Sequence, residues 1–476
     1  MNRRMEMVLT NHTRRHFLQI LGLFTGAGLL GCGPGDGNGE PGDEDPGNGD
    51  PGNGGATVVR GDVTGSGAGA LDSYRAAIDA MKALPSTDPR SWQAQAEIHD
   101  DHCPHGNAFF LPWHRAYLRY FEEVCRVLSN DPSFALPYWN WATHPTIPAP
   151  FWQGTLNDTT RAIDSSTPMP PSAVGQPVID AILAIQDFET FGSGFVPSSC
   201  GSGNACQRQP VAYGALEGTP HNVVHGTIGG NMATFLSPLD PIFWLHHCNV
   251  DRLWVEWNKQ FANPANSYWR SFTFDDNFVN GQGNAVPSVA VDSLFDTFAL
   301  GYRYDTQPEA VPEAAEPAPT SGRVVSSVEV ENTATAEMGR ALTIPMQLSS
   351  EIREQLAPGL EAEGPATTVR LSLVGVETPE NPVLVNLYLG GQTAPASTDA
   401  PGFVRSFGFF PSAAADDPHA HAKTFLFDVG AAMARLDSGA TVPVHVETVP
   451  LRPGVEAAGE GVSPSRVRIE VIEHAA

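Results

Sequence analysis

The chain has 476 residues, of which 53 are acidic and 27 are basic, so its formal net charge is −26. Binding to nucleic acid requires clustered basic side chains that neutralise phosphates, and this excess of acid excludes nucleic acid as a partner. The length predicts two globular units with connecting segments, because single hydrophobic cores rarely grow this large. Nine of the 15 histidines fall between His99 and His247, and this clustering needs a chemical explanation.

The first 32 residues have the layout of a bacterial export signal. The pair Arg14-Arg15 precedes a weakly apolar run, residues 19–31, which contains no acidic residue and is too short to span a membrane as a permanent helix. The run ends in LLGC, which resembles the lipobox whose cysteine, here Cys32, becomes a lipidated N-terminus. A cleaved signal with an incidental cysteine is the alternative. We expect twin-arginine export of the folded protein and a periplasmic or cell-surface lipoprotein, attached to the membrane through the lipid only.

Two segments of unusual composition divide the rest of the chain. Residues 33–57 begin with 23 residues that are all Gly, Pro, Asn, Asp or Glu, and they predict a solvated tether. Residues 306–322, TQPEAVPEAAEPAPTSG, contain four prolines and three glutamates and predict a linker. We therefore expect a helical domain over residues 58–305 and a second domain over residues 323–476.

The second domain is predicted to be an all-β sandwich. Its sequence contains short segments rich in Val and Leu and bounded by Gly, Pro or Asp, which is the pattern of antiparallel strands. These segments are 323–330, 368–374, 383–389, 442–449 and 466–472.

A first group of histidines surrounds a predicted helix. From Phe109 onward, apolar residues recur at intervals of three and four, which places His114 on the same face as Phe110, one turn earlier. His105 precedes this helix beside a glycine, in a loop that can bring a second imidazole to the same point. Either His99 or His102, upstream, can complete a trio.

A second group has sharper spacing. His221 and His225 are four residues apart, which puts two imidazoles on one helical face within reach of one metal ion. His247 follows in a strongly apolar helical pattern, with Phe243 one turn before it. Three neutral imidazoles per ion, with few thiolates or carboxylates nearby, suit copper, zinc or non-haem iron. A dizinc hydrolase is disfavoured because no bridging carboxylate accompanies the histidines.

The segments HGNAFFLPWHRAYLRYFE, PHNVVH and DPIFWLHHCNVDRLW resemble the two copper-binding motifs of the tyrosinase and catechol oxidase (polyphenol oxidase) family. These type-3 dicopper proteins also include molluscan haemocyanins, and the resemblance covers roughly residues 70–305. It implies a helical catalytic domain with a four-helix bundle around two copper ions, Cu A and Cu B. The implied ligands are His105 and His114 for Cu A, and His221, His225 and His247 for Cu B, with His246 as a packing residue.

The remaining Cu A ligand and three further residues also come from the resemblance. His99 lies in QAEIHDDHC, which is similar to a plant pattern for the first ligand, but it precedes His105 by fewer residues than is usual, so His102 stays a rival. Cys103 matches a Cys-x-His pair that forms a thioether to the second ligand in some members, and a free buried thiol is the alternative. Glu217 and Asn222 match a pair proposed to orient a water that deprotonates monophenols, although Glu217 could simply bond a backbone amide. A blocking aromatic over the second copper would fall near residue 234 or 235.

The resemblance implies an activity and its partners. The copper pair would bind O2, oxidise small o-diphenols to o-quinones and ortho-hydroxylate monophenols. The alternative is a haemocyanin-like oxygen carrier that uses the same site without turnover.

The C-terminal region shows a looser resemblance. Tyr302-Arg303-Tyr304 resembles the motif that closes the catalytic domain, and SFGFFPS, HAHAKTFLFDVGAAMARL and VPVHVETVPL are similar to the C-terminal domain of plant polyphenol oxidases. That domain keeps those enzymes latent until the linker is cut, so shielding of the site is our hypothesis here. His419 and His421 either lie in a solvated turn or pass copper inward. Cys200 and Cys206 flank a Gly/Ser loop and could pair in an exported protein.

Overall fold

The computed structural model describes residues 57–308, 322–355, 367–379, 382–391, 393, 397–410, 422–436, 440–452 and 461–474. The predicted signal with Cys32, the tether up to residue 56, most of the predicted linker, and the pair His419 and His421 lie outside these residues. In the described part of the chain, no helix combines the length and apolar character that a membrane span requires.

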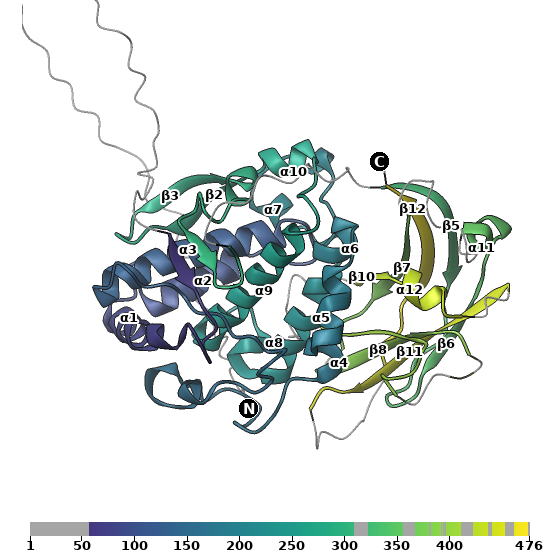
Figure 1. The fold of residues 1–476 in the computed structure, drawn as a ribbon, viewed down its shortest axis with the longest axis horizontal. Helices are drawn as coiled ribbons and strands as arrows, with labels where there is room; N and C mark the ends of the chain where they lie inside the picture. Colours follow the sequence, from purple (N-terminus) through teal and green to yellow (C-terminus); the bar gives the residue numbers. More distant parts are fainter. Residues whose placement is uncertain are drawn as a thin grey trace, which may run out of the picture. The chain divides into compact units, whose positions relative to one another are not determined.

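The helical part comprises residues 57–308 and is built mainly of α-helices joined by long loops (Figure 1). Its helices are α1 (Leu71–Ala83), α2 (Trp92–His102), α3 (Phe110–Ser129), α4 (Pro171–Val174), α5 (Gln176–Leu183), α6 (Phe188–Gly192), α7 (Asn204–Gln207), α8 (Asn222–Ile228), α9 (Ile242–Asn258) and α10 (Ser267–Ser271). A π-helical turn, Glu217–His221, runs directly into α8. The predicted helical domain is thus confirmed.

The helices that carry the clustered histidines have clear boundaries. α2 begins after Ser91, whose side chain accepts a hydrogen bond from the backbone of Ala94. α3 ends at Ser129, and the residue that follows, Asn130, adopts a left-handed conformation with φ of 55°. Because α2, α3, α8 and α9 all lie in one hydrophobic core, their histidines are brought together from four separate segments.

Short strands close the ends of the helical part. β1 (Val58–Arg60) pairs in parallel with β4 (Tyr302–Tyr304), so the start and the end of this part are joined. β2 (Thr273–Val279) and β3 (Ala285–Ala290) form an antiparallel hairpin. Both Tyr302 and Tyr304 donate hydrogen bonds from their hydroxyls to the buried Asp251 of α9, at 2.7 Å each. The Tyr-x-Tyr motif therefore anchors the end of the helical part to its core.

The β part consists of two four-stranded antiparallel sheets, in the orders β10-β7-β12-β5 and β6-β11-β8-β9 (Figure 1). Its strands are β5 (Arg323–Glu331), β6 (Leu342–Gln347), β7 (Thr367–Val376), β8 (Val383–Leu389), β9 (Phe403–Phe407), β10 (Lys423–Asp428), β11 (Thr441–Pro450) and β12 (Arg466–Glu473), with the short helices α11 (Ser350–Gln355) and α12 (Gly430–Met433). Apolar side chains of both sheets share one core, which is the arrangement of a sandwich.

The five strands expected from the sequence correspond to β5, β7, β8, β11 and β12 and are confirmed. Three further strands, β6, β9 and β10, complete the sheets and lie at their edges. β6 contains Pro345, which an edge strand tolerates because one of its sides makes no ladder hydrogen bonds.

The helical and β parts each contribute side chains to the hydrophobic core of the other. Leu384 and Leu451 of the β part belong to the helical core, whereas Tyr213 of the helical part belongs to the β core. The backbone of Tyr213 also pairs with β10, since its N–H donates to the carbonyl of Thr424 at 2.8 Å and its carbonyl accepts from Leu426 at 2.9 Å. The contact is therefore a continuous packed interface within one compact unit.

Candidate metal centre

The first histidine group, His99, His105 and His114, comes from three successive local structures. His99 lies on α2, His105 in the loop that follows, and His114 on α3. Their ring centroids are 5.3 to 5.6 Å apart, and all three side chains are buried. His102 is the last residue of α2 and is partly exposed, whereas His99 is fully buried.

The second histidine group, His221, His225 and His247, comes from the turn before α8, from α8 and from α9. Its ring centroids are 4.5 to 5.4 Å apart. The two groups meet, because the rings of His114 and His247 stack at 4.5 Å. The predicted spacing on one helical face therefore holds, and six imidazoles converge on one buried place.

Five of the six imidazoles are held through Nδ1 by an oxygen of the chain. A backbone carbonyl or an oriented amide oxygen can only accept, so the imidazoles of His99, His114, His221 and His225 must carry a proton on Nδ1 and leave a lone pair on Nε2. The oxygens and their distances to Nδ1 are Phe235 O for His99 (2.6 Å), Glu217 Oε1 for His105 (3.0 Å), Phe110 O for His114 (2.8 Å), Asn222 Oδ1 for His221 (2.9 Å) and Met232 O for His225 (2.5 Å).

The Nε2 atoms left by this anchoring face one another. Nε2 of His99 lies 3.4 Å from Nε2 of His114, so two lone pairs oppose each other without a hydrogen between them. Nε2 of His225 lies 3.2 Å from Nε2 of His247. Nε2 of His105 is buried without a hydrogen-bond partner among the described residues, and so is Nε2 of His221. The opposed lone pairs of His99 and His114 and the unpartnered Nε2 atoms of His105 and His221 favour a cation at this place.

A proton is not that cation. Burial lowers the pKa of all six imidazoles, to about 3 for His114 and His225, so they are neutral at ordinary pH. Neutral imidazoles with fixed Nδ1 partners are the usual ligands of copper, zinc or non-haem iron. The residues therefore fit a pair of metal ions.

His246 differs from its neighbour His247. The indole N–H of Trp141 donates to Nδ1 of His246 at 3.0 Å, so a neutral His246 carries its proton on Nε2. A nitrogen that carries a proton cannot ligate a metal. The geometry thus favours the predicted packing role, even though His246 lies close to the other three histidines of this half.

Glu217 and Asn222 are both fully buried and contact one histidine each. Besides His105, Oε1 of Glu217 accepts from the backbone N–H of Gly106 at 2.8 Å, while Oε2 accepts from Ser193 Oγ at 2.6 Å. Burial raises the pKa of Glu217 to about 8. The side-chain amide of Asn222 donates to the carbonyl of Gly408 at 3.1 Å. Both residues therefore orient an imidazole of the site.

Cys103 is a buried free thiol close to the first group. Its sulfur and ring nitrogens of His99 and His105 all lie within 4.8 Å of one another. The predicted neighbourhood of Cys103 and His105 is therefore present in the fold.

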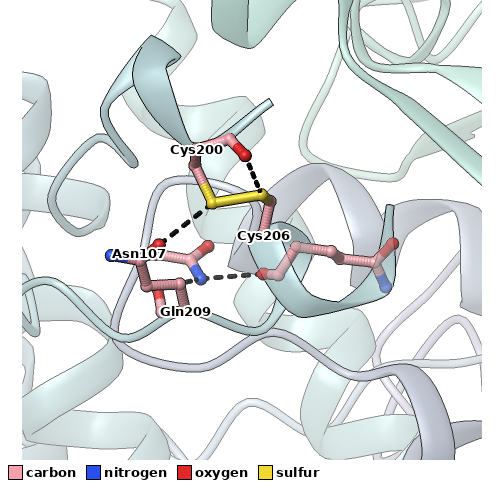
Figure 2. The surroundings of a disulfide bond; sticks show 5 residues. Asn107, Cys200, Cys206 and Gln209 are labelled. Carbon is pink, nitrogen blue, oxygen red and sulfur yellow. Dashed lines mark hydrogen bonds between the residues drawn. A yellow bond between two sulfur atoms is a disulfide. The ribbon is translucent and has the colours of Figure 1, made fainter. Parts of the chain in front are cut away.

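Cys200 and Cys206 form a disulfide, as the sequence allowed (Figure 2). The bond closes the loop of residues 200–206, which includes the start of α7. The side-chain amide of Asn107, two residues after His105, donates to the backbone carbonyl of Gln207 at 2.9 Å. The Gln207 side chain in turn donates to the last backbone carbonyl of α2 at 2.5 Å. The stapled loop thus holds both α2 and the loop of His105.

Phe410 is a site residue that the sequence reasoning did not single out. It belongs to the β part, yet its ring centroid lies 4.3 Å from that of His225 and 4.8 Å from that of His105. Phe235, one of the two positions expected to carry a blocking aromatic, contacts the ring of Phe410 at 5.7 Å. Lys423 of β10 donates to the carbonyl of Phe410 at 2.9 Å. The segment SFGFFPS, which resembles plant polyphenol oxidases, indicates the region, but it does not indicate which of its aromatic residues enters the site.

Comparison with known proteins identifies the helical part. Residues 89–169 and 157–260 match the family described as the common central domain of tyrosinase. Polyphenol oxidase A1 of Vicia faba is 30% identical over 305 residues, covering 55% of this chain and 49% of that protein. A tyrosinase of Hahella sp. (strain CCB-MM4) is 31% identical over 285 residues, covering 49% and 60% respectively. The chain thus spans about half the length of the curated relatives it matches.

Solved structures share the fold of both parts. Latent apple tyrosinase aligns with a TM-score of 0.65 over 88% of this chain and 98% of that chain, at 22% identity. Latent aurone synthase, a polyphenol oxidase, aligns with a TM-score of 0.67 over 89% and 91%, at 20% identity. Residues 89–260 thus match the common central domain of tyrosinase, and the chain is similar in sequence to polyphenol oxidases and a tyrosinase.

Proposed function

We propose that this chain binds two copper ions and oxidises small phenols with O2. The observation that carries the proposal is the set of imidazoles held through Nδ1, whose free Nε2 atoms converge in one buried place. Cu A would be held by His99, His105 and His114, and Cu B by His221, His225 and His247. We assign His99 rather than His102 because His99 is fully buried and its Nε2 faces that of His114.

A copper pair, when bound, supplies the oxidation of o-diphenols to o-quinones, in which O2 is reduced to water. The protein orients the imidazoles and excludes water from them. The Nδ1 partners fix each imidazole, and the rings of Phe110 and Phe243, which contact His114 at 4.8 Å and His247 at 4.1 Å, exclude water from the ligands.

Monophenol hydroxylation is part of the proposal. Glu217 and Asn222 lie beside the imidazoles of His105 and His221, where a water that takes the phenolic proton would be oriented. In this structure the two side chains form hydrogen bonds with other residues of the protein: Glu217 accepts from Ser193, and Asn222 donates to Gly408 of the β part. Hydroxylation should therefore depend on release of Asn222 from Gly408.

The position of Phe410 supports the proposal that the β part keeps the enzyme latent. Its ring occupies the space beside His225 and His105 that an aromatic substrate would need. The test is to cut within residues 306–322, separate the β part, and compare the turnover of a catechol. We expect the turnover to rise, and an unchanged turnover after separation would overturn latency.

Two further parts of the proposal concern covalent modification and export. A thioether between Cys103 and His105 would leave the peptide that contains both residues lighter by two hydrogens in mass spectrometry. Replacement of Arg14 and Arg15 by lysine should block export, and Cys32→Ala should remove membrane attachment without blocking export. Cell fractionation of the three forms measures both effects.

The activity test separates the enzyme from an oxygen carrier. The protein is loaded with copper and exposed to O2, the absorption band that depends on both is recorded, and tyrosine and catechol are then offered separately. Failure to bind copper, or absence of the band, would overturn the copper site. A band without turnover, even after the β part is removed, would favour the carrier. We propose the enzyme because the relatives compared above are named for oxidation.

A further inference from the structure

Residues 217–228 carry two histidines of the second group. Along this segment, one row of residues faces the candidate metal centre, and the residues that directly follow each of them form a second row. Glu217, His221 and His225 are spaced by four residues and face the candidate metal centre. The residues that directly follow them also lie on one side of the helix, because four residues make about one helical turn. These following residues, Gly218, Asn222 and Gly226, all contact the β part.

The contact along the second row is close and polar. Gly408 of the β part donates its N–H to the carbonyl of Gly218 at 2.9 Å and accepts from the amide of Asn222 at 3.1 Å. A Cβ atom at Gly226 would lie 2.9 Å from Leu451 Cδ2 and displace it. The absence of a side chain at Gly226 therefore lets the β part approach the backbone of α8 directly.

Arg452 completes this contact at the end of α8. Its Nη2 donates to the carbonyl of Gly226 at 2.7 Å, and its Nε donates to the carbonyl of Thr227 at 3.0 Å. The last carbonyls of a helix have no partner within the helix, and a cation placed there is also favoured by the helix dipole. The guanidinium thus satisfies two carbonyls that directly follow His225.

We propose that Arg452 is a positioning residue of the second metal site, and that docking of the β part through Arg452 tightens the binding of the metal held by His221, His225 and His247. The inference rests on the proposed metal site but not on phenol oxidation. Because coupling between two equilibria is reciprocal, the bound metal would also strengthen docking of the β part. The β part then has two opposed effects, since Phe410 covers the site while Arg452 supports it.

The test compares Arg452→Met with Arg466→Met, a matched loss of one arginine in the β part. Arg466 pairs with Glu329 within its own sheet. Each full-length protein is loaded with copper and dialysed against a competing chelator, and the bound copper is measured over time. We expect R452M to lose one equivalent about tenfold faster than the wild type and R466M, the effect typical of an outer partner of a ligand. R452K, which keeps the charge and one donor, should recover part of the loss.

A double substitution separates positioning from general destabilisation. In an H225A background the second site is already disabled, so adding R452M should not alter retention of the remaining copper. Near-ultraviolet circular dichroism of the metal-free proteins reports whether each variant folds. Equal retention in R452M and the wild type would overturn the inference, and so would equal weakening of both copper ions. If the wild type bound no copper, the proposed metal site itself would fail.

Discussion

The two histidine groups are supported in different ways. The second group lies on two neighbouring helices, and the β part holds one of these helices from behind through Gly408 and Arg452. The first group joins a helix end, a loop and a helix start, and the loop stapled by the Cys200–Cys206 disulfide holds it from the side. Helix geometry alone can bring two imidazoles together, whereas a loop ligand needs further contacts that fix its backbone. Each metal ion would therefore depend on the contacts that support its own histidine group.

The largest effect should follow removal of a single ligand from either group. We expect His99→Ala and His225→Ala each to lose one copper equivalent and to reduce catechol oxidation by more than about 100-fold, the upper end of what loss of an outer partner produces. Copper content and initial rates measure this. His102→Ala is the matched control for the first group and should keep both copper ions. If instead H102A lost copper and H99A kept it, the composition of the first group would be wrong.

The two groups are tied together by a buried ion pair. Arg115 of α3 donates to Asp251 of α9 at 2.6 Å, and Arg60 lies 3.5 Å from the same carboxylate. Asp251→Asn leaves buried guanidinium charge uncompensated and should lower the free energy of unfolding by about 3 to 5 kcal/mol. Denaturant unfolding of the metal-free protein measures the change. Glu473→Gln, which breaks the exposed pair with Arg323, should cost less than about 1 kcal/mol. A similar decrease in the free energy of unfolding for the two variants would contradict a structural role of the buried Asp251 ion pair.

Removal of the disulfide should affect the first group selectively. The cross-link closes a short loop, and its loss should lower the free energy of unfolding by about 2 kcal/mol through chain entropy. In the double variant Cys200→Ser/Cys206→Ser, we expect faster loss of one copper equivalent to a chelator. The copper that remains should be the one that R452M loses. In that case, adding the disulfide substitutions to H99A, which keeps only the copper of the second group, should not change its retention. Loss of both ions at one rate would remove the distinction between the two supports.

The smallest effect is expected for substitution of Phe410, which covers the candidate metal centre. Phe410→Ala opens the space beside His225 and His105 but leaves the rest of the β part docked. Catechol turnover of the uncut chain should rise by less than about tenfold, which corresponds to roughly 1.4 kcal/mol of barrier. Phe403→Ala removes a ring of the same size that packs on Tyr388 within the β part, and it should leave turnover unchanged. Equal effects of the two variants would indicate a general loosening of the β part.

Much of the fold followed from local patterns. The helix through His114 and the central strands of the β part were predicted because strong apolar periodicity marks elements that are buried along one or both faces. The strands β6, β9 and β10 carry a weaker signal because they are only five or six residues long, and β6 also contains a proline. The fourth edge strand, β5, has nine residues and was predicted. The hairpin of β2 and β3 was missed because its strands are half exposed.

The sequence by itself placed His221 and His225 on one face, since imidazoles four residues apart on a helix share a face whatever surrounds them. It left the choice between His99 and His102 open, and the burial of His99 and its contact with His114 favour His99. Only the tertiary structure decided what holds the histidines. Segments far away along the chain supply the carbonyl of Phe235 for His99, the carboxyl group of Glu217 for His105 and the indole that engages His246. They also supply Phe410 and Arg452. Such contacts depend on the docking of whole elements, and a local pattern does not record which distant backbone will pack against it.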